Sequence, residues 1–246
     1  MNSSKHQIRL YADSLGLPRP GVVNYDERYF SLFLNWFREQ AKSEPEIVDH
    51  SRSNTTIKDL CSWFFEDNRY YGDKADVIIL QNGIVDCAPR PIPRKVRNII
   101  SKLPNFLRKH VIKFLHNHRS KLQNLGLKYF LVKPDDFLEE YKKFLTLASK
   151  VAKRVYVFNI VPTNDAIETQ SPGLKKSITD YNELITRSIK ETGFENVHLL
   201  DVNKFVESNI KNLDDYVLKE DGHHITKLSH RIYADMIIEI EKKYLP

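Results

Sequence analysis

The feature that most constrains this chain is a repeated alternation of short apolar runs with longer helical patterns. Five runs rich in Val, Ile and Leu have the length of buried strands: Ile8–Ala12, Glu46–Asp49, Val77–Gln81, Val155–Ile160 and Val197–Val202. Runs that are apolar on both faces suit a parallel sheet covered by helices on both sides. The alternation therefore predicts an α/β fold, a three-layer α/β/α sandwich around a parallel sheet of about five strands.

Patterns of helical period fill the gaps between these runs. Asn24, with Glu27 three residues later, forms a capping-box signal for a helix that runs to about Lys42. Further helices are predicted at about 55–66, 135–153, 174–192 and 226–243. The 246 residues are 41% hydrophobic and show no internal repeat. We therefore predict a single domain over residues 1–246, with a basic helical insertion at about 89–128.

Positive charge is concentrated in that insertion. The segment Pro89–Lys128 contains eleven Lys and Arg residues and no Asp or Glu, which leaves 27 basic and 32 acidic residues elsewhere. From Asn105 to Leu125 its apolar positions have the spacing of an amphipathic helix. Two interpretations stay open: a solvated helical excursion, or a surface for an anionic ligand or a membrane. No RNA or DNA recognition motif is present, so we do not expect a nucleic acid partner.

Several other classes of protein do not fit the sequence. Cys61 and Cys87 are too few for a disulfide framework and lack metal-ligand spacing. The first apolar run is too short for a signal peptide, and no run approaches the roughly 20 apolar residues that span a bilayer. A dinucleotide-binding Gly-x-Gly and a P-loop are both missing. We therefore expect a cytoplasmic protein that needs no cofactor and no metal.

The residues with catalytic potential follow the first predicted strand and precede the last predicted helix. Ser14 lies in the turn after the first run, and Asp221 and His224 form the one Asp-x-x-His of the chain. A Ser hydroxyl becomes a nucleophile when an imidazole accepts its proton and a carboxylate orients that imidazole. These three residues can therefore form a catalytic triad. The alternative is a turn serine and a capped helix start with surface histidines.

Together, the Asp13-Ser14-Leu15 block and the Asp221-x-x-His224 block resemble the SGNH/GDSL hydrolase superfamily. The resemblance implies that Ser14 is the nucleophile, His224 the base and Asp221 its partner, on an α/β/α fold with a flavodoxin-like sheet. It also implies an oxyanion hole built from blocks after the second and third strands. The backbone N–H groups at the matching positions are those of Ser14, Ser53 and Gly83.

The chain departs from the superfamily pattern at three positions. Ala12 replaces the Gly of the first block, Ser53 stands where the oxyanion Gly is usual, and Val85 replaces the Asn of the third block. A missing oxyanion donor typically costs about 10²–10³ in rate. Asn82 and Gln81 are candidate substitutes, but in an extended chain Asn82 would point to the face opposite Val85.

Five residues near these blocks are expected to bind substrate: Asp13, Arg19, Asn82, Asp86 and Arg90. Arginine recognises carboxylate or phosphate groups, although pairing of the two arginines with helix ends or with Asp86 is the structural alternative. The strings around Arg19 and Arg90 resemble a branch of the superfamily associated with bacterial surface-polysaccharide gene clusters.

That resemblance implies a serine esterase acting on an acyl ester, expected to be an O-acetyl group, on a carbohydrate or on another small acyl ester. Two alternatives stay open. One is an O-acetyltransferase for a surface polysaccharide or its precursor. The other is a non-hydrolytic binding protein on the same scaffold, because the oxyanion blocks are altered.

Overall fold

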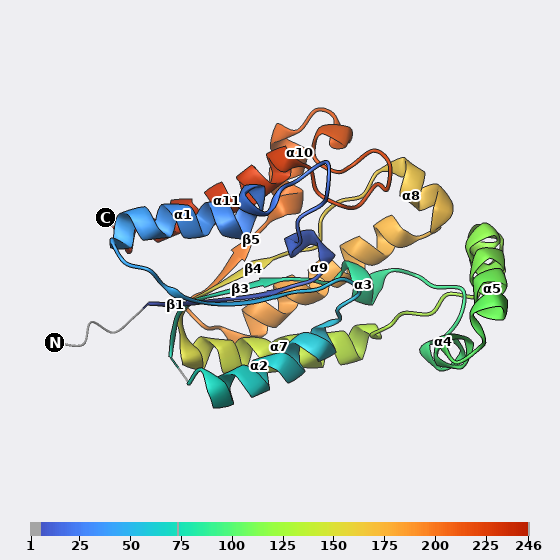
Figure 1. Cartoon of the computed structure of the whole chain (residues 1–246), viewed down its shortest axis with the longest axis horizontal. Coiled ribbons are helices and arrows are strands. Elements are labelled where there is room, and N and C mark those ends of the chain that lie inside the picture. The colour runs from blue at the N-terminus through green and yellow to red at the C-terminus, as the bar shows by residue number, and fades with distance from the viewer. Residues whose placement is uncertain (1–5, 73, 246) are drawn as a thin grey trace.

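The computed structural model describes residues 6–72 and 74–245. Its centre is a five-stranded sheet in the order β2-β1-β3-β4-β5, in which every neighbouring pair is parallel (Figure 1). The strands are β1 (Gln7–Ala12), β2 (Glu46–Ser51), β3 (Ala75–Gln81), β4 (Ala152–Phe158) and β5 (Val197–Leu200). The α/β class, the parallel pairing and the five strands are as the sequence predicts.

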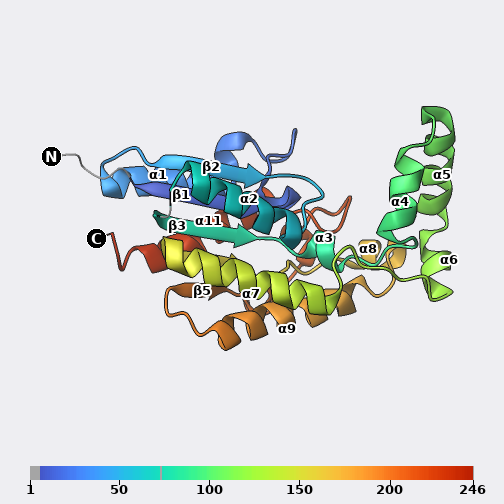
Figure 2. The same ribbon diagram turned by 90° about the horizontal axis from the view of Figure 1, so that it is seen from below.

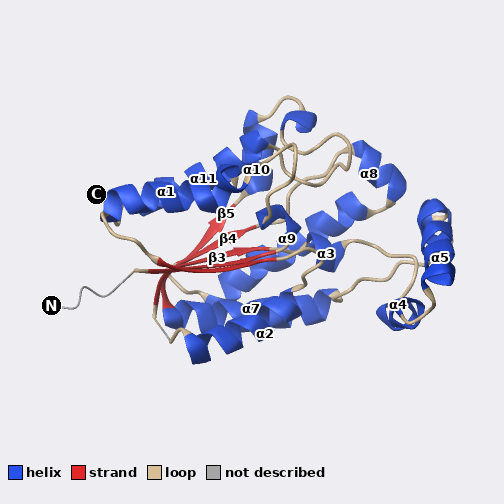
Figure 3. Ribbon diagram, viewed as in Figure 1, coloured by secondary structure: helices blue, strands red, loops and turns tan. Residues whose placement is uncertain are grey.

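Helices cover both faces of this sheet (Figure 3). One face packs against α1 (Tyr29–Ala41), α10 (Val202–Asn209) and α11 (Lys227–Glu241); the other packs against α2 (Ile57–Tyr70), α7 (Pro134–Val151) and α9 (Leu174–Thr192). Successive strand residues point to opposite faces, so Ile8 and Leu10 of β1 enter the first core while Tyr11 enters the second. Two separate apolar cores follow, one on each side of the sheet.

The prediction that all five runs are buried strands is wrong for β2. This strand is at the edge of the sheet and pairs with β1 alone. Val48 is buried, but Ile47 is 37% exposed and Glu46 and Asp49 face solvent. An edge strand lacks a neighbour on one side, which is why charged residues are tolerated there.

The observed helix boundaries agree best with the predicted ones where the periodic pattern of the sequence is long. α9 begins and ends as predicted, and Thr226 caps α11 through a hydrogen bond from the Ser229 N–H. The capping box at Asn24 is present, but it caps a single 3-10 turn, Tyr25–Glu27, and α1 starts at Tyr29. Short elements had no periodic signal in the sequence: 3-10 turns at Ser14–Gly16 and Leu213–Asp215, and helices α3 (Ile84–Cys87) and α8 (Asp165–Gln170).

The basic segment leaves the sandwich as three helices, α4 (Arg94–Ser101), α5 (Asn105–Asn117) and α6 (Arg119–Asn124). Figure 2 shows them standing apart from the sheet layers. The single helix expected from Asn105 to Leu125 is divided at His118. Arg90 and Tyr129 exchange two backbone hydrogen bonds of 2.9 Å, so the segment departs and returns at one point. None of the described helices is both long and apolar enough to cross a membrane.

Candidate active site

Ser14 lies at the carboxyl edge of the sheet, in the first turn after β1. The preceding residue, Asp13, shapes this turn: its N–H donates to the Gln81 carbonyl (3.1 Å), and its Oδ1 accepts the Leu15 N–H (2.9 Å). β1 lies between β2 and β3 in the sheet, so the strand before the turn is hydrogen-bonded on both sides. The Ser14 side chain therefore projects from a well-fixed position.

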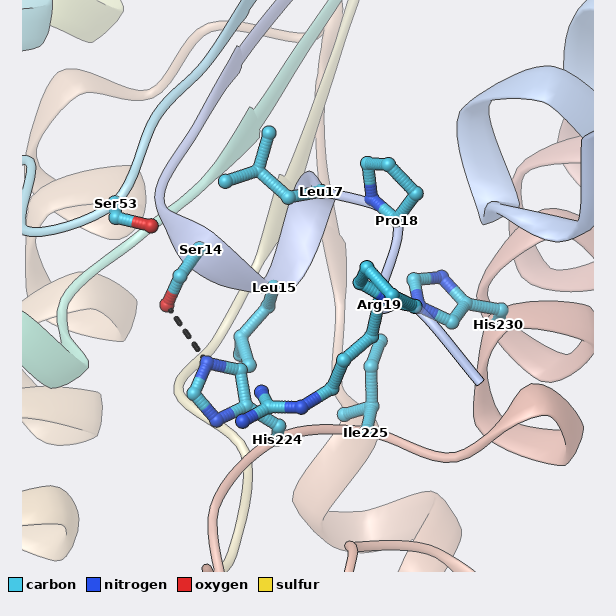
Figure 4. A pocket seen from close by; sticks show the side chains of 10 residues that line it. Ser14, Leu15, Leu17, Pro18, Arg19, Ser53, His224, Ile225 and His230 are labelled. Carbon is cyan, nitrogen blue, oxygen red and sulfur yellow. Dashed lines mark hydrogen bonds between the residues drawn. The ribbon is translucent and has the colours of Figure 1, made fainter. Parts of the chain in front are cut away.

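Asp221 and His224 are brought to Ser14 by the loop before α11. Asp221 Oδ1 accepts the backbone N–H groups of His223 (3.2 Å) and His224 (2.9 Å), which holds the carboxylate inside its own loop. His224 Nδ1 lies 3.1 Å from Asp221 Oδ2, and His224 Nε2 lies 3.1 Å from Ser14 Oγ (Figure 4). With the Nδ1 proton directed at the carboxylate, the Nε2 lone pair faces the Ser14 hydroxyl.

The electrostatics of the loop keep this imidazole neutral. Burial lowers the pKa of His224 to about 4, and the neighbouring His223 and Arg19 add to this effect against the opposing charge of Asp221. Burial alone would raise the pKa of Asp221, but hydrogen bonds from the backbone N–H groups of His224 and His223 outweigh it and hold that pKa below its usual value. At neutral pH the loop thus presents a carboxylate and a neutral imidazole, which can accept a proton.

Arg19, expected to bind substrate, lies beside the triad. Its Nη2 is 2.7 Å from Asp221 Oδ2, the same oxygen that His224 approaches. Arg19, Ser14, Ser53 and His224 all line one cavity of about 430 Å³ (Figure 4). Arg19 is therefore an ion-pair partner of Asp221 that also borders the space a substrate would enter.

The proposed oxyanion donors are placed unequally. Ser53 borders the cavity on the side of Ser14 away from His224 (Figure 4), whereas Gly83 does not line it. Within the described residues, the backbone N–H groups of Ser14, Ser53 and Gly83 have no hydrogen-bond acceptor. Ser14 and Ser53 can thus offer free N–H donors to a group bound in the cavity.

Asp13, Asn82 and Asp86, which were expected to bind substrate, are all buried, and none of them lines the cavity. Asn82 Nδ2 donates to Asp86 Oδ2 (3.3 Å), and Asp86 Oδ1 accepts the Ile57 N–H (3.0 Å). Burial raises the pKa of Asp86 well above its usual value and that of Asp13 to about 6. These side chains brace the turns beneath the site.

The extended-chain argument for Asn82 fails. β3 ends at Gln81, and Gly83 has a φ of 123° that turns the chain into α3. Val85 therefore lies in α3 rather than on a strand, so strand alternation does not relate it to Asn82, which instead donates to Asp86 of the same helix. Arg90 is not at the active-site rim either: its side chain borders a second cavity among α4, α5 and α6.

His230 is a cavity residue that the sequence analysis missed. It lies in the first turn of α11, its Nδ1 accepts the Tyr29 N–H (3.1 Å), and burial lowers its pKa to about 3. The neutral tautomer therefore carries its proton on Nε2. Leu17, Pro18 and Ile225 supply apolar wall. The signal for His230 was weak, because a histidine inside a helix is ordinarily a surface or core residue.

One group in the described chain has the spacing of metal ligands. It is Asp221, His223 and His224, whose ligand atoms lie within 4.8 Å of one another. Of the three, His224 already bonds to Asp221 through Nδ1 and to Ser14 through Nε2. The donor set thus fits the hydrogen-bond chain of the triad, and we assign no metal to it.

Comparison with solved structures finds chains of similar fold. No protein-family model matches the sequence, and a search of curated proteins finds no match. The fold is similar to a lipase/acylhydrolase from Enterococcus faecalis, with a TM-score of 0.61 and 13% identity over 98% of this chain and 97% of that one. It is similar to the acetylxylan esterase Axe2 from Geobacillus stearothermophilus, with a TM-score of 0.60 and 14% identity over 97% and 95% of the two chains.

A third similar structure is a lipolytic protein of the G-D-S-L family from Desulfitobacterium hafniense, with a TM-score of 0.57 and 15% identity over 96% of this chain and 99% of that one. The class defined here is an α/β/α sandwich with a Ser–His–Asp chain at the carboxyl edge of its sheet. The α/β/α fold is similar to that of a G-D-S-L family protein, which agrees with the fold implied by the resemblance of the Ser14 and His224 blocks.

Proposed function

We propose that this protein is a serine esterase of the SGNH type, with Ser14, His224 and Asp221 as its catalytic triad. The observation that supports the proposal most directly is the continuous hydrogen-bond chain from Asp221 through His224 to Ser14, with 3.1 Å at each link. The residues are 210 positions apart in sequence, and the chain of bonds ends in an open cavity. Serine hydrolases on unrelated folds use this same arrangement.

The reaction follows from the geometry. Ser14 Oγ attacks the ester carbonyl carbon while His224 Nε2 accepts its proton, and the carbonyl oxygen becomes an oxyanion. The N–H groups of Ser14 and Ser53 donate to that oxyanion. The intermediate collapses, the C–O bond breaks, and the departing alcohol takes the proton from His224. Water then attacks the acyl-enzyme with His224 again as base, releasing the acid and restoring Ser14.

We propose an acetyl ester on a carbohydrate as the substrate class. Two observations support this choice: the cavity is small, about 430 Å³, and two of the similar structures are described as acetylxylan esterases. The polar side chains of Arg19 and His230 on the wall are suited to sugar hydroxyls. A sugar hydroxyl that replaces water in the second step would make the same residues an O-acetyltransferase.

Turnover of p-nitrophenyl acetate by purified protein tests the proposal. Wild type should turn over, and Ser14→Ala and His224→Ala should each lose activity by roughly 10⁴-fold or more. Ser53→Ala is the matched control in the same cavity. It retains the backbone N–H, so its activity should stay within a few-fold of wild type.

The time course separates the two reaction types. Steady release of p-nitrophenol indicates hydrolysis, and a burst followed by very slow turnover indicates an acyl-enzyme that waits for an acceptor alcohol. Equal activity of wild type and Ser14→Ala would contradict the proposed nucleophile.

A further inference from the structure

A second cavity, outside the proposed active site, lies within the basic excursion. It has a volume of about 470 Å³ and is bordered by α4, α5 and α6 and the chain before them. Four arginines line it: Arg90, Arg97, Arg108 and Arg119. The rest of the wall is largely apolar and includes Ile92, Ile100, Ile112 and Leu115. We refer to this space as the arginine cavity.

None of the described residues that line the arginine cavity is acidic. The sequence from Pro89 to Lys128 contains no Asp or Glu, and no ion pair joins any of the four arginines to a described carboxylate. Arg108 and Arg119 donate to neutral oxygens, such as Ser101 O and Pro89 O. Grouping cations without an anion is unfavourable, so the site is suited to bind one.

Of the four arginines, Arg90 and Arg97 have the fewest hydrogen-bond partners for their guanidinium groups. Neither side chain donates a hydrogen bond to another described residue, and Arg90 Nε is buried without a partner. Burial, reinforced by the charges of Arg97 and Arg119, lowers the pKa of Arg90 to about 10, which still leaves it protonated at neutral pH. Two guanidinium groups are therefore available to an incoming anion. Guanidinium is well matched to phosphate in geometry.

The helices around the cavity also expose large apolar side chains. Ile99 of α4 is 64% exposed, and Phe106 and Phe114 of α5 are 63% and 56% exposed. Val96, Leu107 and Ile112 are exposed as well, and Ile112 also lines the arginine cavity. Exposed apolar groups interleaved with lysine and arginine, in a segment that contains no Asp or Glu, have the composition of a membrane-surface helix.

We propose that α4, α5 and α6 bind the surface of an anionic phospholipid bilayer, with a head-group phosphate in the arginine cavity and the exposed apolar side chains in the interface. Charge complementarity selects this occupant. A second copy that met this face by two-fold symmetry would set cations against cations. Nucleic acid would satisfy the arginines, but it would leave aliphatic groups such as Ile99 and Leu107 without a partner.

The surface adjoins the proposed active site through a short stretch of chain. Arg97 and Ser101 of α4 share a small neighbouring cavity with Asn54, and the preceding residue, Ser53, lines the active-site cavity. Figure 1 shows α4 and α5 beyond the carboxyl ends of the strands, the edge of the sheet that Ser14 follows. Docking of α4 and α5 on a bilayer would thus bring the active-site end of the sandwich close to the membrane surface.

Vesicle co-sedimentation of the full chain tests the proposal. Wild type should partition onto vesicles that contain phosphatidylglycerol much more strongly than onto phosphatidylcholine alone, and added salt should weaken the binding. Arg90→Gln/Arg97→Gln should weaken it by about 25-fold, since each basic residue near an anionic surface contributes about fivefold. Arg69→Gln/Arg231→Gln, which removes the same charge from exposed sites on α2 and α11, should change it less than twofold.

Two further variants and readouts complete the test. Ile99→Ser/Phe106→Ser should also weaken vesicle binding, because the interface loses apolar area. Thermal unfolding and p-nitrophenyl acetate turnover of each variant report whether the fold is intact. Equal binding to both vesicle types, or wild-type binding by the Arg90→Gln/Arg97→Gln variant, would overturn the proposal. So would self-association, binding of single-stranded RNA, or binding of inorganic phosphate, each without binding to vesicles.

Discussion

Arg19 and His224 share one oxygen of Asp221, and the charge of Arg19 adds to burial and to His223 in lowering the pKa of His224. Arg19 Nη2 lies 2.7 Å from Asp221 Oδ2, and His224 Nδ1 lies 3.1 Å from it. His224 acts only when neutral, so kcat/KM should fall as the pH drops through its pKa, near 4 in the wild type.

Arg19→Gln should shift the acidic fall of kcat/KM, the acid limb of the pH profile, to higher pH. The substitution removes a cation that lowers the pKa of His224 and leaves Asp221 free to stabilise the imidazolium. The measurement is kcat/KM for p-nitrophenyl acetate from about pH 3 to 8. An acid limb that stays in place or moves downward in Arg19→Gln would contradict this account of the ion pair.

Asp13 should make the stability of the fold depend on pH. Its carboxyl is fully buried, Oδ2 has no partner among the described residues, and burial raises its pKa to about 6. A carboxyl whose pKa is higher in the folded than in the unfolded state stabilises the fold below about pH 4, and the gain is lost as the pH rises to 6. The size of this loss is about 3 kcal/mol in the free energy of unfolding.

Asp13→Asn should abolish most of that dependence, because the amide does not ionise, while its oxygen can still accept the Leu15 N–H. Urea unfolding of both proteins between pH 4 and 7 measures the difference. Parallel pH profiles for the two proteins would show that Asp13 does not titrate in this range.

At the residue scale, the sequence was sufficient to predict that Ser14, Asp221 and His224 lie together, because these residues stand at recognisable positions beside a strand and a helix. It was insufficient for the neighbours. Arg19 meets Asp221 through tertiary folding that no local pattern records, and Asp86 is withdrawn into the core by its bonds to Asn82 and Ile57.

At the scale of elements, the loop that carries Asp221 and His224 depends on one glycine. Gly222 has a φ of 71°, and its backbone lies so close to Asn164 that an added Cβ would be 2.1 Å from Oδ1. Gly222→Ala should therefore destabilise the fold by about 1–3 kcal/mol and lower turnover, because the loop must move relative to α8.

Gly126→Ala is the matched control for this substitution. Gly126 has a φ of 87°, with nothing within 4 Å of the added Cβ, so it carries the backbone strain without the clash. Urea unfolding and p-nitrophenyl acetate turnover of both variants measure the effects. If Gly126→Ala lowers turnover as much as Gly222→Ala, the close approach to Asn164 is not what holds the triad loop.

Helices were predictable from the sequence when their apolar pattern repeated over many turns, and strands when they were buried along their whole length. α9 repeats its apolar positions over five turns of helix, and β3 is buried along its whole length. α3 has four residues, too few to show a period. The sequence did not predict the break between α5 and α6 at His118, because the helical spacing of apolar residues continues across this position.

At the scale of the whole molecule, the basic excursion should be separable from the sandwich. Arg90 and Tyr129 face each other in an antiparallel bridge, so an Asn-Gly turn can replace residues 91–128. We expect this variant to fold and to retain p-nitrophenyl acetate turnover within a few-fold, since the triad lies outside the segment. It should lose binding to vesicles that contain phosphatidylglycerol.

Circular dichroism and turnover of the shortened chain, beside the full chain, measure this. Some loss of stability is expected, because Arg119 and Gln123 donate to the Pro89 carbonyl across the junction. A shortened chain that is unfolded or inactive would mean that the excursion is an integral part of the domain.

The central claim is that Ser14 is a nucleophile activated by His224, and covalent trapping tests it most directly. Incubation with a fluorophosphonate, followed by mass spectrometry of the intact protein and of its peptides, should give one adduct per chain, on Ser14. His224→Ala should slow its formation by several orders of magnitude. An adduct on another residue, or none on the wild type, would contradict the assignment of Ser14.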